Sequence, residues 1–363
     1  MSSSIEIKKG GIVKYLEKLR PEIDRIIEKY IPKKATKEWL EFVFGKPSYS
    51  YNLKVAQKTL IEPTWNFLNR GGKRWRPILF LLVTEATGGD MKKIKDFALI
   101  PELIHDGTLI IDDIEDQSEF RRGKPCLHKI FGEDIAINVG NFLYYLPLLV
   151  FIKNKNKFKP EVLLRAYETY IQEMINIGFG QGTDIFWHKG KADKISEKEY
   201  LQMCIFKTGC LSRMSAKLAV ILSKRSDKLA EKVGKIAEAI GVAFQIQDDI
   251  LNLTGEEFGK KKGGLGEDIT EGKMSLLVIH TLKKANRKDK KRLIKILNFH
   301  TTNQSLRNEA IEIIQKYRSI GYAKKIARKI VADSWKETEN LLPASSARNK
   351  LEEFIDYLIE RKI

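Results

Sequence analysis

Residues 103–116 read LIHDGTLIIDDIED, an apolar stretch of helical pattern that leads into a charged end. Through most of the chain, apolar residues recur at spacings of three and four, for example at Ile236, Ile240, Phe244 and Leu251. This spacing is the period of a helix with one buried face, whereas alternating strand patterns are hard to find. We therefore expect an all-α protein, a helical bundle that forms a single domain over residues 1–363.

The charged end of the opening stretch contains Asp112, Asp113, Glu115 and Asp116. Residues four apart on a helix lie on one face, about 6 Å apart along the axis. Asp112 and Asp116 would thus present two carboxylates side by side, which repel each other unless a cation lies between them. Magnesium is held by one or two carboxylates together with water and substrate phosphates. A solvated acidic helix end is the plain alternative, because this motif alone is a weak signal.

A second cluster resembles the first: residues 241–252 read GVAFQIQDDILN. Asp248 and Asn252 would share a helical face, with Gln245 one turn earlier. A doubled, spaced pair of clusters arises by chance far less often than one does. Two such helices facing each other would bind a magnesium diphosphate between them.

Two basic loops accompany the acidic clusters. Residues 71–77 read GGKRWRP, and residues 121–125, which follow the first cluster closely, read RRGKP. Glycine lets backbone N–H groups approach an anion, and lysine and arginine donate charge-assisted hydrogen bonds to phosphate oxygens. Cations so close to a carboxylate cluster suit a charged ligand end that a metal leaves partly exposed.

Two further basic segments are ambiguous. Lys207 and Thr208 stand in an otherwise apolar stretch, so the lysine either extends along the surface or points into a polar cavity. A glycine-rich segment, residues 255–272, is equally well explained as a disordered loop. The charged residues that could bind a ligand here are Lys260, Lys261, Lys262, Glu267 and Asp268, with Lys273 just after the segment.

Composition excludes several classes of protein. The 363 residues include 65 lysines and arginines against 47 acidic residues, a formal net charge of +18. Without an RNA-binding aromatic signature or a zinc finger, this charge favours anionic small substrates or a solvated surface over nucleic acid. Three cysteines without paired spacing argue against a disulfide scaffold or a zinc site and indicate a reducing compartment, so we expect a cytoplasmic protein.

No segment targets the chain to a membrane by its pattern. The first residues lack the apolar core of a signal peptide. The longest apolar run, residues 142–152, is shorter than the roughly 20 residues that a spanning helix needs. We expect no transmembrane segment.

With these motifs in place, the sequence resembles the trans-isoprenyl diphosphate synthase family, in particular the geranylgeranyl diphosphate synthases. The resemblance runs in order from about residue 69 to residue 280, through GGKRWRP, LIHDGTLIIDDIEDQSEFRRGKP, GQGTDIFW, KTG, FQIQDDILNL and EDITEGK. It implies the isoprenoid synthase fold, a helical bundle with a central active-site cavity. It also implies a homodimer built from helices.

The resemblance also implies roles for residues of this sequence. Asp112, Asp116 and Asp248 would bind three magnesium ions that hold an allylic diphosphate. The residues that would bind substrate are Lys73, Arg76, His105, Arg121, Arg122, Lys207, Gln245, Lys262 and Lys273. Catalytic roles fall to Lys207, Thr208 and Gln245, of which the last two would face the developing allylic cation. Gln181 and Asp184 would lie near the second metal cluster. One departure concerns Lys262, which stands one residue before the family's usual lysine position.

The implied reaction joins isopentenyl diphosphate to an allylic diphosphate, which is dimethylallyl, geranyl or farnesyl diphosphate. In this family, bulky residues at the positions of Gly107 and Thr108 stop the growing chain early. Their small size here predicts a product of twenty carbons or more, with Tyr144, Tyr145 or Phe142 as a deeper floor. Geranylgeranyl diphosphate is the expected product.

Three alternatives remain. A longer-chain synthase differs only in the product, and a terpene cyclase would bind a single diphosphate, against the two basic loops. A non-catalytic regulatory or prenyl-binding subunit would typically lack one of these motifs.

Overall fold

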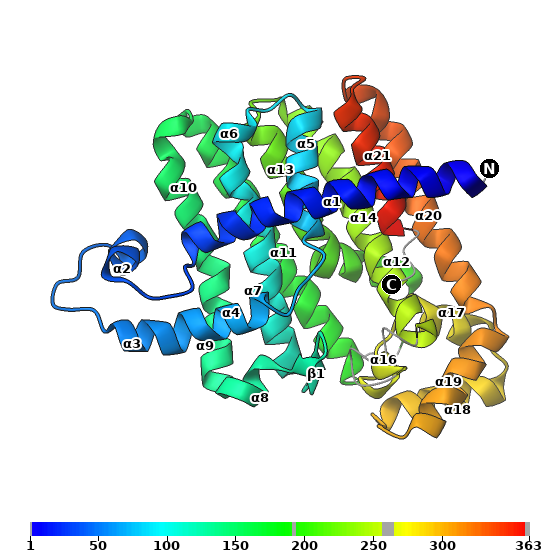
Figure 1. Ribbon diagram of the computed structural model, residues 1–363. Helices are drawn as coiled ribbons and strands as arrows, with labels where there is room; N and C mark the ends of the chain where they lie inside the picture. The colour runs from blue at the N-terminus through cyan, green and yellow to red at the C-terminus, as the bar shows by residue number, and fades with distance from the viewer. Residues whose placement is uncertain (1, 191–193, 256–264, 360–363) are drawn as a thin grey trace. The chain divides into compact units, whose positions relative to one another are not determined.

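The computed structural model describes residues 2–190, 194–255 and 265–359, which are helical almost throughout (Figure 1). Within these ranges the only strands are β1 (Phe120–Arg121) and β2 (Lys124–Pro125), which form one short antiparallel pair. The prediction of an all-α protein is therefore confirmed.

The described chain divides into two compact units. The N-terminal unit runs to Ala166 and includes Leu218–Arg225 and Ser345–Leu351, and the C-terminal unit contains the remaining segments. Three of the boundaries fall inside helices, namely α11 (Pro160–His188), α13 (Cys210–Leu222) and α21 (Ser346–Ile359). The expectation of a single domain and of a central cavity stays a prediction.

Helix α7 (Leu99–Glu115) carries the first acidic cluster and packs along α9 (Glu133–Tyr145), its main partner in the N-terminal unit. Leu99, Leu103 and Ile104 are fully buried, so this helix forms because its apolar face is covered. The helix ends at its acidic cluster, where Gln117 adopts a positive φ of 53°. The other helical segments of this unit are α1 (Ser2–Tyr30), α2 (Lys37–Phe44), α3 (Leu53–Ala56), η1 (Gln57–Ile61), α4 (Glu62–Leu68), α5 (Trp75–Ala86), α6 (Met91–Ile94), η2 (Lys95–Ala98), α8 (Leu127–Phe131), η3 (Leu146–Leu148), α10 (Leu149–Asn154) and η4 (Lys155–Lys157).

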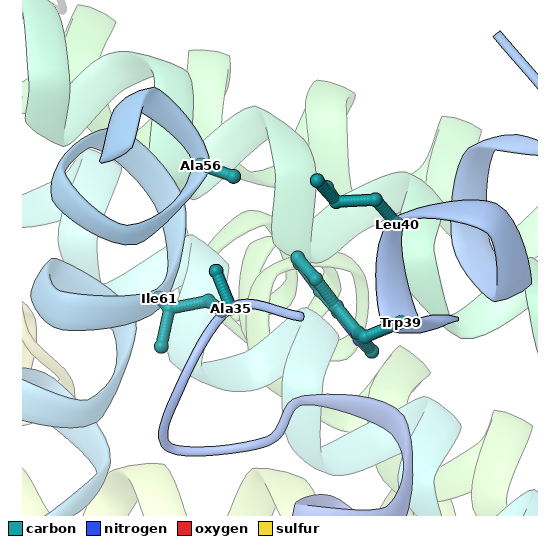
Figure 2. Packing of buried hydrophobic residues seen from close by; sticks show 5 residues of the cluster. All are labelled: Ala35, Trp39, Leu40, Ala56 and Ile61. Atoms are coloured by element: carbon teal, nitrogen blue, oxygen red, sulfur yellow. The ribbon is translucent and has the colours of Figure 1, made fainter. Parts of the chain in front are cut away.

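A small apolar cluster joins α2 to the η1 segment (Figure 2). Its buried members are Ala35, Trp39, Leu40, Ala56 and Ile61. The indole of Trp39 donates a hydrogen bond of 2.8 Å to the carbonyl oxygen of Tyr30, and Phe142 of α9 packs against the cluster from outside. The cluster thus fixes the N-terminal helices to the helix that supports α7.

One helical stretch among the described residues, Glu133–Lys157, is long and apolar enough to cross a bilayer by length and composition, with a mean hydropathy of 1.8. It extends on both sides of the apolar run 142–152, so the helical stretch is longer than that run. Half of its most apolar window is buried inside the protein, and core helices of soluble proteins meet the same criterion.

In the C-terminal unit, α14 (Asp227–Thr254) carries the second acidic cluster and packs mainly against α20 (Ser319–Thr338) and the π-helix η5 (Ile205–Gly209). The side chain of Ser226 caps its first turn by accepting a hydrogen bond from the N–H of Leu229. The other helical segments of this unit are α12 (Glu197–Cys204), α16 (Glu267–Thr270), α17 (Leu276–Lys284), α18 (Arg287–Asn298), α19 (Gln304–Lys316) and η6 (Glu339–Leu341).

Candidate active site

The first acidic cluster lies at the C-terminal end of α7, with an arginine beside it. Asp113 is buried and its Oδ1 accepts a hydrogen bond of 2.7 Å from Nε of Arg121. A second guanidinium nitrogen of Arg121 also bonds to Asp113 and lies 3.6 Å from Oδ2 of Asp112. Asp113 therefore holds the arginine, and Asp112 and Asp116 stand one turn apart at the end of the helix. This pairing places Arg121 of the second basic loop beside the carboxylate cluster.

A tight hairpin carries the arginines of that loop. Arg121 and Lys124 are paired in β1 and β2, so Arg122 and Gly123 form the two-residue turn between the strands. Both turn residues have a positive φ, 54° and 76°, which matches the turn type that suits the twist of a hairpin. The turn directs Arg122 back toward the first basic loop.

Arg122 joins the two basic loops. Its guanidinium donates to the carbonyl oxygen of Gly71 and lies 3.4 Å from Oδ1 of the buried Asp106. It also lies over the ring of Phe67, 5.2 Å from the centroid. A Cβ atom on Gly72 would meet the guanidinium at 3.3 Å, so glycine is needed where the loop and the arginine approach closely.

Within the first loop, neighbouring cations have different surroundings. Lys73 is exposed, whereas Arg76 is buried with its guanidinium 4.5 Å from the ring centroid of Trp75. Arg74 is buried and pairs with Glu102 at 2.6 Å and with Asp106 at 3.0 Å. It is a structural cation that anchors the loop to α7.

His105 lies among these cations. Burial and then the positive charges of Arg76 and Arg122 hold the pKa of His105 well below its usual value. The imidazole is therefore neutral near neutral pH and can contribute hydrogen bonds but no charge to an anion bound there.

The positions expected to set product length differ in their surroundings. A Cβ atom on Gly107 would lie 2.9 Å from the carbonyl oxygen of Gly140, so Gly107 faces α9 and permits the close approach of the two helices. Thr108 is partly exposed, and its hydroxyl donates to the carbonyl oxygen of His105 at 2.7 Å. The expectation that Gly107 leaves a pocket open is corrected, since α9 fills the space beside it.

The three aromatic floor candidates differ in their exposure. Tyr144 is partly buried, and burial, with the charges of Glu115 and Asp112, raises the pKa of its phenol. Tyr145 is 70% exposed, which corrects the expectation that it forms a floor of the product pocket. Phe142 is partly buried against the cluster of Trp39, and its role as a floor stays a prediction.

In the C-terminal unit, Lys207 and Thr208 lie in the π-helix η5. Nζ of Lys207 pairs with Oδ2 of Asp184 at 2.6 Å, and a Cβ atom on Gly180 would collide with the backbone of Lys207. Two segments that the sequence separates, GQGTD and KTG, therefore meet here. Lys207 therefore pairs with a carboxylate among polar residues and does not extend along the surface.

Thr208 and Gln245 are hydrogen-bonded to each other, with the threonine hydroxyl donating to Oε1 of the amide at 3.0 Å. Nε2 of the same amide donates to Oδ1 of Asp249 at 2.9 Å. Burial and the neighbouring Asp268 raise the pKa of Asp249 to about 7. The predicted pair of catalytic polar groups is thus brought together, next to a buried carboxylate that the motif analysis did not single out.

The last residue of the second acidic cluster is hydrogen-bonded to the segment that follows it. Asn252 accepts hydrogen bonds from the backbone N–H groups of Gly266, through its carbonyl oxygen, and of Asp268, through its side chain. Lys273 pairs with Asp268 and Glu271. Lys260, Lys261 and Lys262 lie outside the described residues.

The carboxylates fit magnesium by their chemistry. Asp112, Asp116 and Asp248 offer hard oxygen atoms, and all three are partly buried. Within the described ranges, no group of three or more His, Cys, Asp or Glu side chains is already arranged as a closed metal site.

Sequence reasoning missed Arg74, Glu102 and Asp106, which together support the first basic loop. Their signal is visible in retrospect, because two acids four residues apart inside an apolar helix need a buried cation. Tyr200 was also missed: it donates a hydrogen bond of 2.7 Å to Asp249.

The fold and these residues define a class of all-helical proteins in which carboxylate clusters stand beside arginines and lysines that suit diphosphates. The chain belongs to the polyprenyl synthetase family, whose sequence model matches residues 57–314.

Individual relatives agree with this assignment. The short chain isoprenyl diphosphate synthase of Methanothermobacter thermautotrophicus is 35% identical over 308 residues, 85% of this chain and 92% of the relative. The geranylgeranyl diphosphate synthase of Saccharolobus solfataricus is 32% identical over 314 residues, with the same coverage of 85% and 92%. The crystal structure of geranylgeranyl pyrophosphate synthetase from Pyrococcus horikoshii superposes with a TM-score of 0.82 at 31% identity, covering 97% of this chain and 99% of that one.

Proposed function

We propose that the protein is a prenyltransferase that condenses isopentenyl diphosphate with an allylic diphosphate and makes geranylgeranyl diphosphate. The observation that carries the proposal is the arginine-lined end of α7, where Asp112 lies 3.6 Å from a guanidinium nitrogen of Arg121, in a chain of the polyprenyl synthetase family. This end offers a negative surface for a metal and a positive one for phosphate oxygens.

In the proposed reaction, the C–O bond of the allylic diphosphate breaks and the diphosphate leaves with the bonding electrons. The double bond of isopentenyl diphosphate attacks the allylic cation, a carbon–carbon bond forms, and a proton leaves C2 to restore a double bond. The departing diphosphate takes this proton, so the protein supplies no nucleophile. The chain's contribution is to orient both substrates and to stabilise the leaving group.

Asp112, Asp116 and Asp248 are the residues that would hold magnesium. Bound magnesium would neutralise the charge that develops on the leaving diphosphate. Arg121, Lys207 and Lys273 would bind oxygens of the same diphosphate, and Lys262 is a further proposed ligand from outside the described residues.

The first basic loop is proposed to hold isopentenyl diphosphate. Arg76 and Arg122 supply positive charge, and exposed Lys73 reaches the solvent side of the loop. Neutral His105 would add a hydrogen bond. Because Arg122 is braced by Asp106 and Gly71, its guanidinium is oriented before the substrate arrives.

We also propose a homodimer in the cytoplasm. Within the C-terminal unit, Ile171, Ile175, Phe179 and Phe186 lie on one face of α11 and are each at least 51% exposed. Apolar side chains gathered on one helix face indicate a protein interface, and a second copy of the chain would cover them. Light scattering should give twice the chain mass, and the double substitution Ile175→Glu and Phe179→Glu should give a monomer.

The function is tested by incubating the protein with magnesium, labelled isopentenyl diphosphate and farnesyl diphosphate, then separating dephosphorylated products by chromatography. The proposal predicts a twenty-carbon alcohol. A longer alcohol would favour the longer-chain alternative. Magnesium-dependent binding of both substrates without turnover would contradict the enzyme assignment and favour a regulatory subunit.

A further inference from the structure

A continuous chain of hydrogen bonds lies behind the Lys207–Thr208 turn of the C-terminal unit. The phenol of Tyr200, on α12, donates to Oδ2 of Asp249 on α14 at 2.7 Å. Tyr200 is 1% exposed and Asp249 is 6% exposed, so the bond is formed away from solvent. The chain therefore begins at a buried donor on one helix and a buried acceptor on another.

The other carboxylate oxygen continues the chain toward the turn. Oδ1 of Asp249 accepts from Nε2 of Gln245 at 2.9 Å, and Oε1 of Gln245 accepts from the hydroxyl of Thr208 at 3.0 Å. Both oxygens of Asp249 are thus engaged by protein donors. Asp248, the neighbouring carboxylate, is the one proposed for magnesium.

The direction of every bond in this chain is determined by its chemistry. Burial, and then the charge of Asp249, raises the pKa of Tyr200 well above its usual value, so the phenol keeps its proton. Oδ1 of Asp249 accepts from Nε2 of Gln245, so the NH₂ group of the amide faces the carboxylate. The amide carbonyl then has to face Thr208.

We propose that Tyr200 and Asp249 are positioning residues that lock the amide of Gln245, so that its carbonyl oxygen and the Thr208 oxygen face the allylic cation. This inference rests on the proposed function. An oxygen dipole held toward a developing positive charge stabilises the transition state without reorganisation. A turned amide would present its NH₂ group instead and would raise the barrier to ionisation.

Asp249→Asn is the direct test, because asparagine keeps the shape of the side chain but can donate to the amide oxygen and turn Gln245 around. We expect kcat to fall about 100-fold, as when one preorganised dipole is lost. The KM for each substrate and the magnesium dependence should change little, because the substituted group touches neither. A raised magnesium requirement with unchanged kcat would contradict the proposal and make Asp249 a metal ligand.

A double-mutant cycle shows whether Asp249 acts through Gln245. Gln245→Ala removes the amide, so adding Asp249→Asn to it should cost little further activity. If the two losses multiply, Asp249 acts independently of the amide and the proposal is overturned. Wild-type enzyme without any turnover would instead contradict the proposed function, which separates the two failures.

Tyr200→Phe is a second variant that leaves the carboxylate in place. It removes the phenol that donates to Asp249, and we expect kcat to fall about tenfold with unchanged KM values. The matched control is Tyr322→Phe, which removes a 2.6 Å hydrogen bond to Glu197. Glu197 also lies on α12, but this bond is not part of the hydrogen-bond series from Tyr200 to Thr208. Equal kcat losses in the two variants would indicate a merely structural role for Tyr200 and contradict the proposal.

Discussion

At the residue scale, burial separates neighbours that look alike in the sequence. Lys73 and Arg74 are adjacent cations of one glycine-rich loop, yet Lys73 is exposed and Arg74 is 4% exposed between two acids. The loop pattern predicted anion binding for the segment as a whole. It could not assign one cation to the ligand and the other to the core, because that depends on where Glu102 and Asp106 lie on α7.

Arg74→Ala should destabilise the protein by about 3–5 kcal/mol, because Glu102 and Asp106 would remain buried without their partner. Lys73→Ala should change the free energy of unfolding by less than about 0.5 kcal/mol and should raise the KM for isopentenyl diphosphate. Urea unfolding followed by circular dichroism measures both. Equal stability of the two variants would refute the structural role of Arg74.

The three cysteines should be inert in the folded protein. All are buried, and burial raises the pKa of Cys126 and of Cys204, with the nearby carboxylates of Asp113 and Asp249 acting in the same direction. A raised thiol pKa leaves less of the reactive thiolate. Mass spectrometry after iodoacetamide treatment at pH 8 should find native protein unmodified and urea-unfolded protein fully modified. Rapid alkylation of native protein would contradict this burial.

At the element scale, apolar spacing predicted that the two acidic clusters lie on helices, now seen as α7 and α14. It did not predict which way single side chains point. Gly107 and Thr108 are adjacent, but one faces α9 and the other is partly exposed. The helical period fixes an angle between neighbours, while the partner that each side meets depends on the packing of another helix. For this reason Tyr145 was predicted to form a floor of the product pocket, although it is exposed.

Gly107→Ala should loosen the packing of α7 on α9. The added methyl group would meet the carbonyl oxygen of Gly140 at 2.9 Å, and overpacking of this kind costs about 1–3 kcal/mol. Gly321→Ala, at a helical glycine of α20 with nothing within 4 Å of its Cβ position, is the matched control. Thermal unfolding should show a lower midpoint for Gly107→Ala only. Equal midpoints would contradict the close approach of the helices.

Product length should respond to the side chains that face the interior. Thr108→Phe is expected to shorten the product, and Tyr144→Ala is expected to lengthen it. Tyr145→Ala should leave the product unchanged, because Tyr145 is 70% exposed. Chromatography of the dephosphorylated products measures all three, and an effect of Tyr145 equal to that of Tyr144 would overturn the assignment.

At the scale of the whole molecule, the fold class followed from apolar spacing and the family from six ordered motifs, and the family model covers the whole stretch that contains them. The supporting contacts could not be predicted in this way. Asp249 and Tyr200 are 49 residues apart, and their hydrogen bond exists only because α12 packs near α14. Sequence patterns report local periodicity, and the pairing of Tyr200 with Asp249 leaves no local signal.

The proposed function requires that both acidic clusters act, through magnesium, on one diphosphate. Calorimetry can test it with an allylic diphosphate analogue in which sulfur replaces the reacting oxygen, titrated into wild-type protein, Asp112→Asn, Asp248→Asn and the double variant. We predict one magnesium-dependent site per chain, affinity at least about tenfold weaker in each single variant, and losses in the double variant that do not multiply. Wild-type affinity in either single variant, or two independent sites per chain, would contradict it.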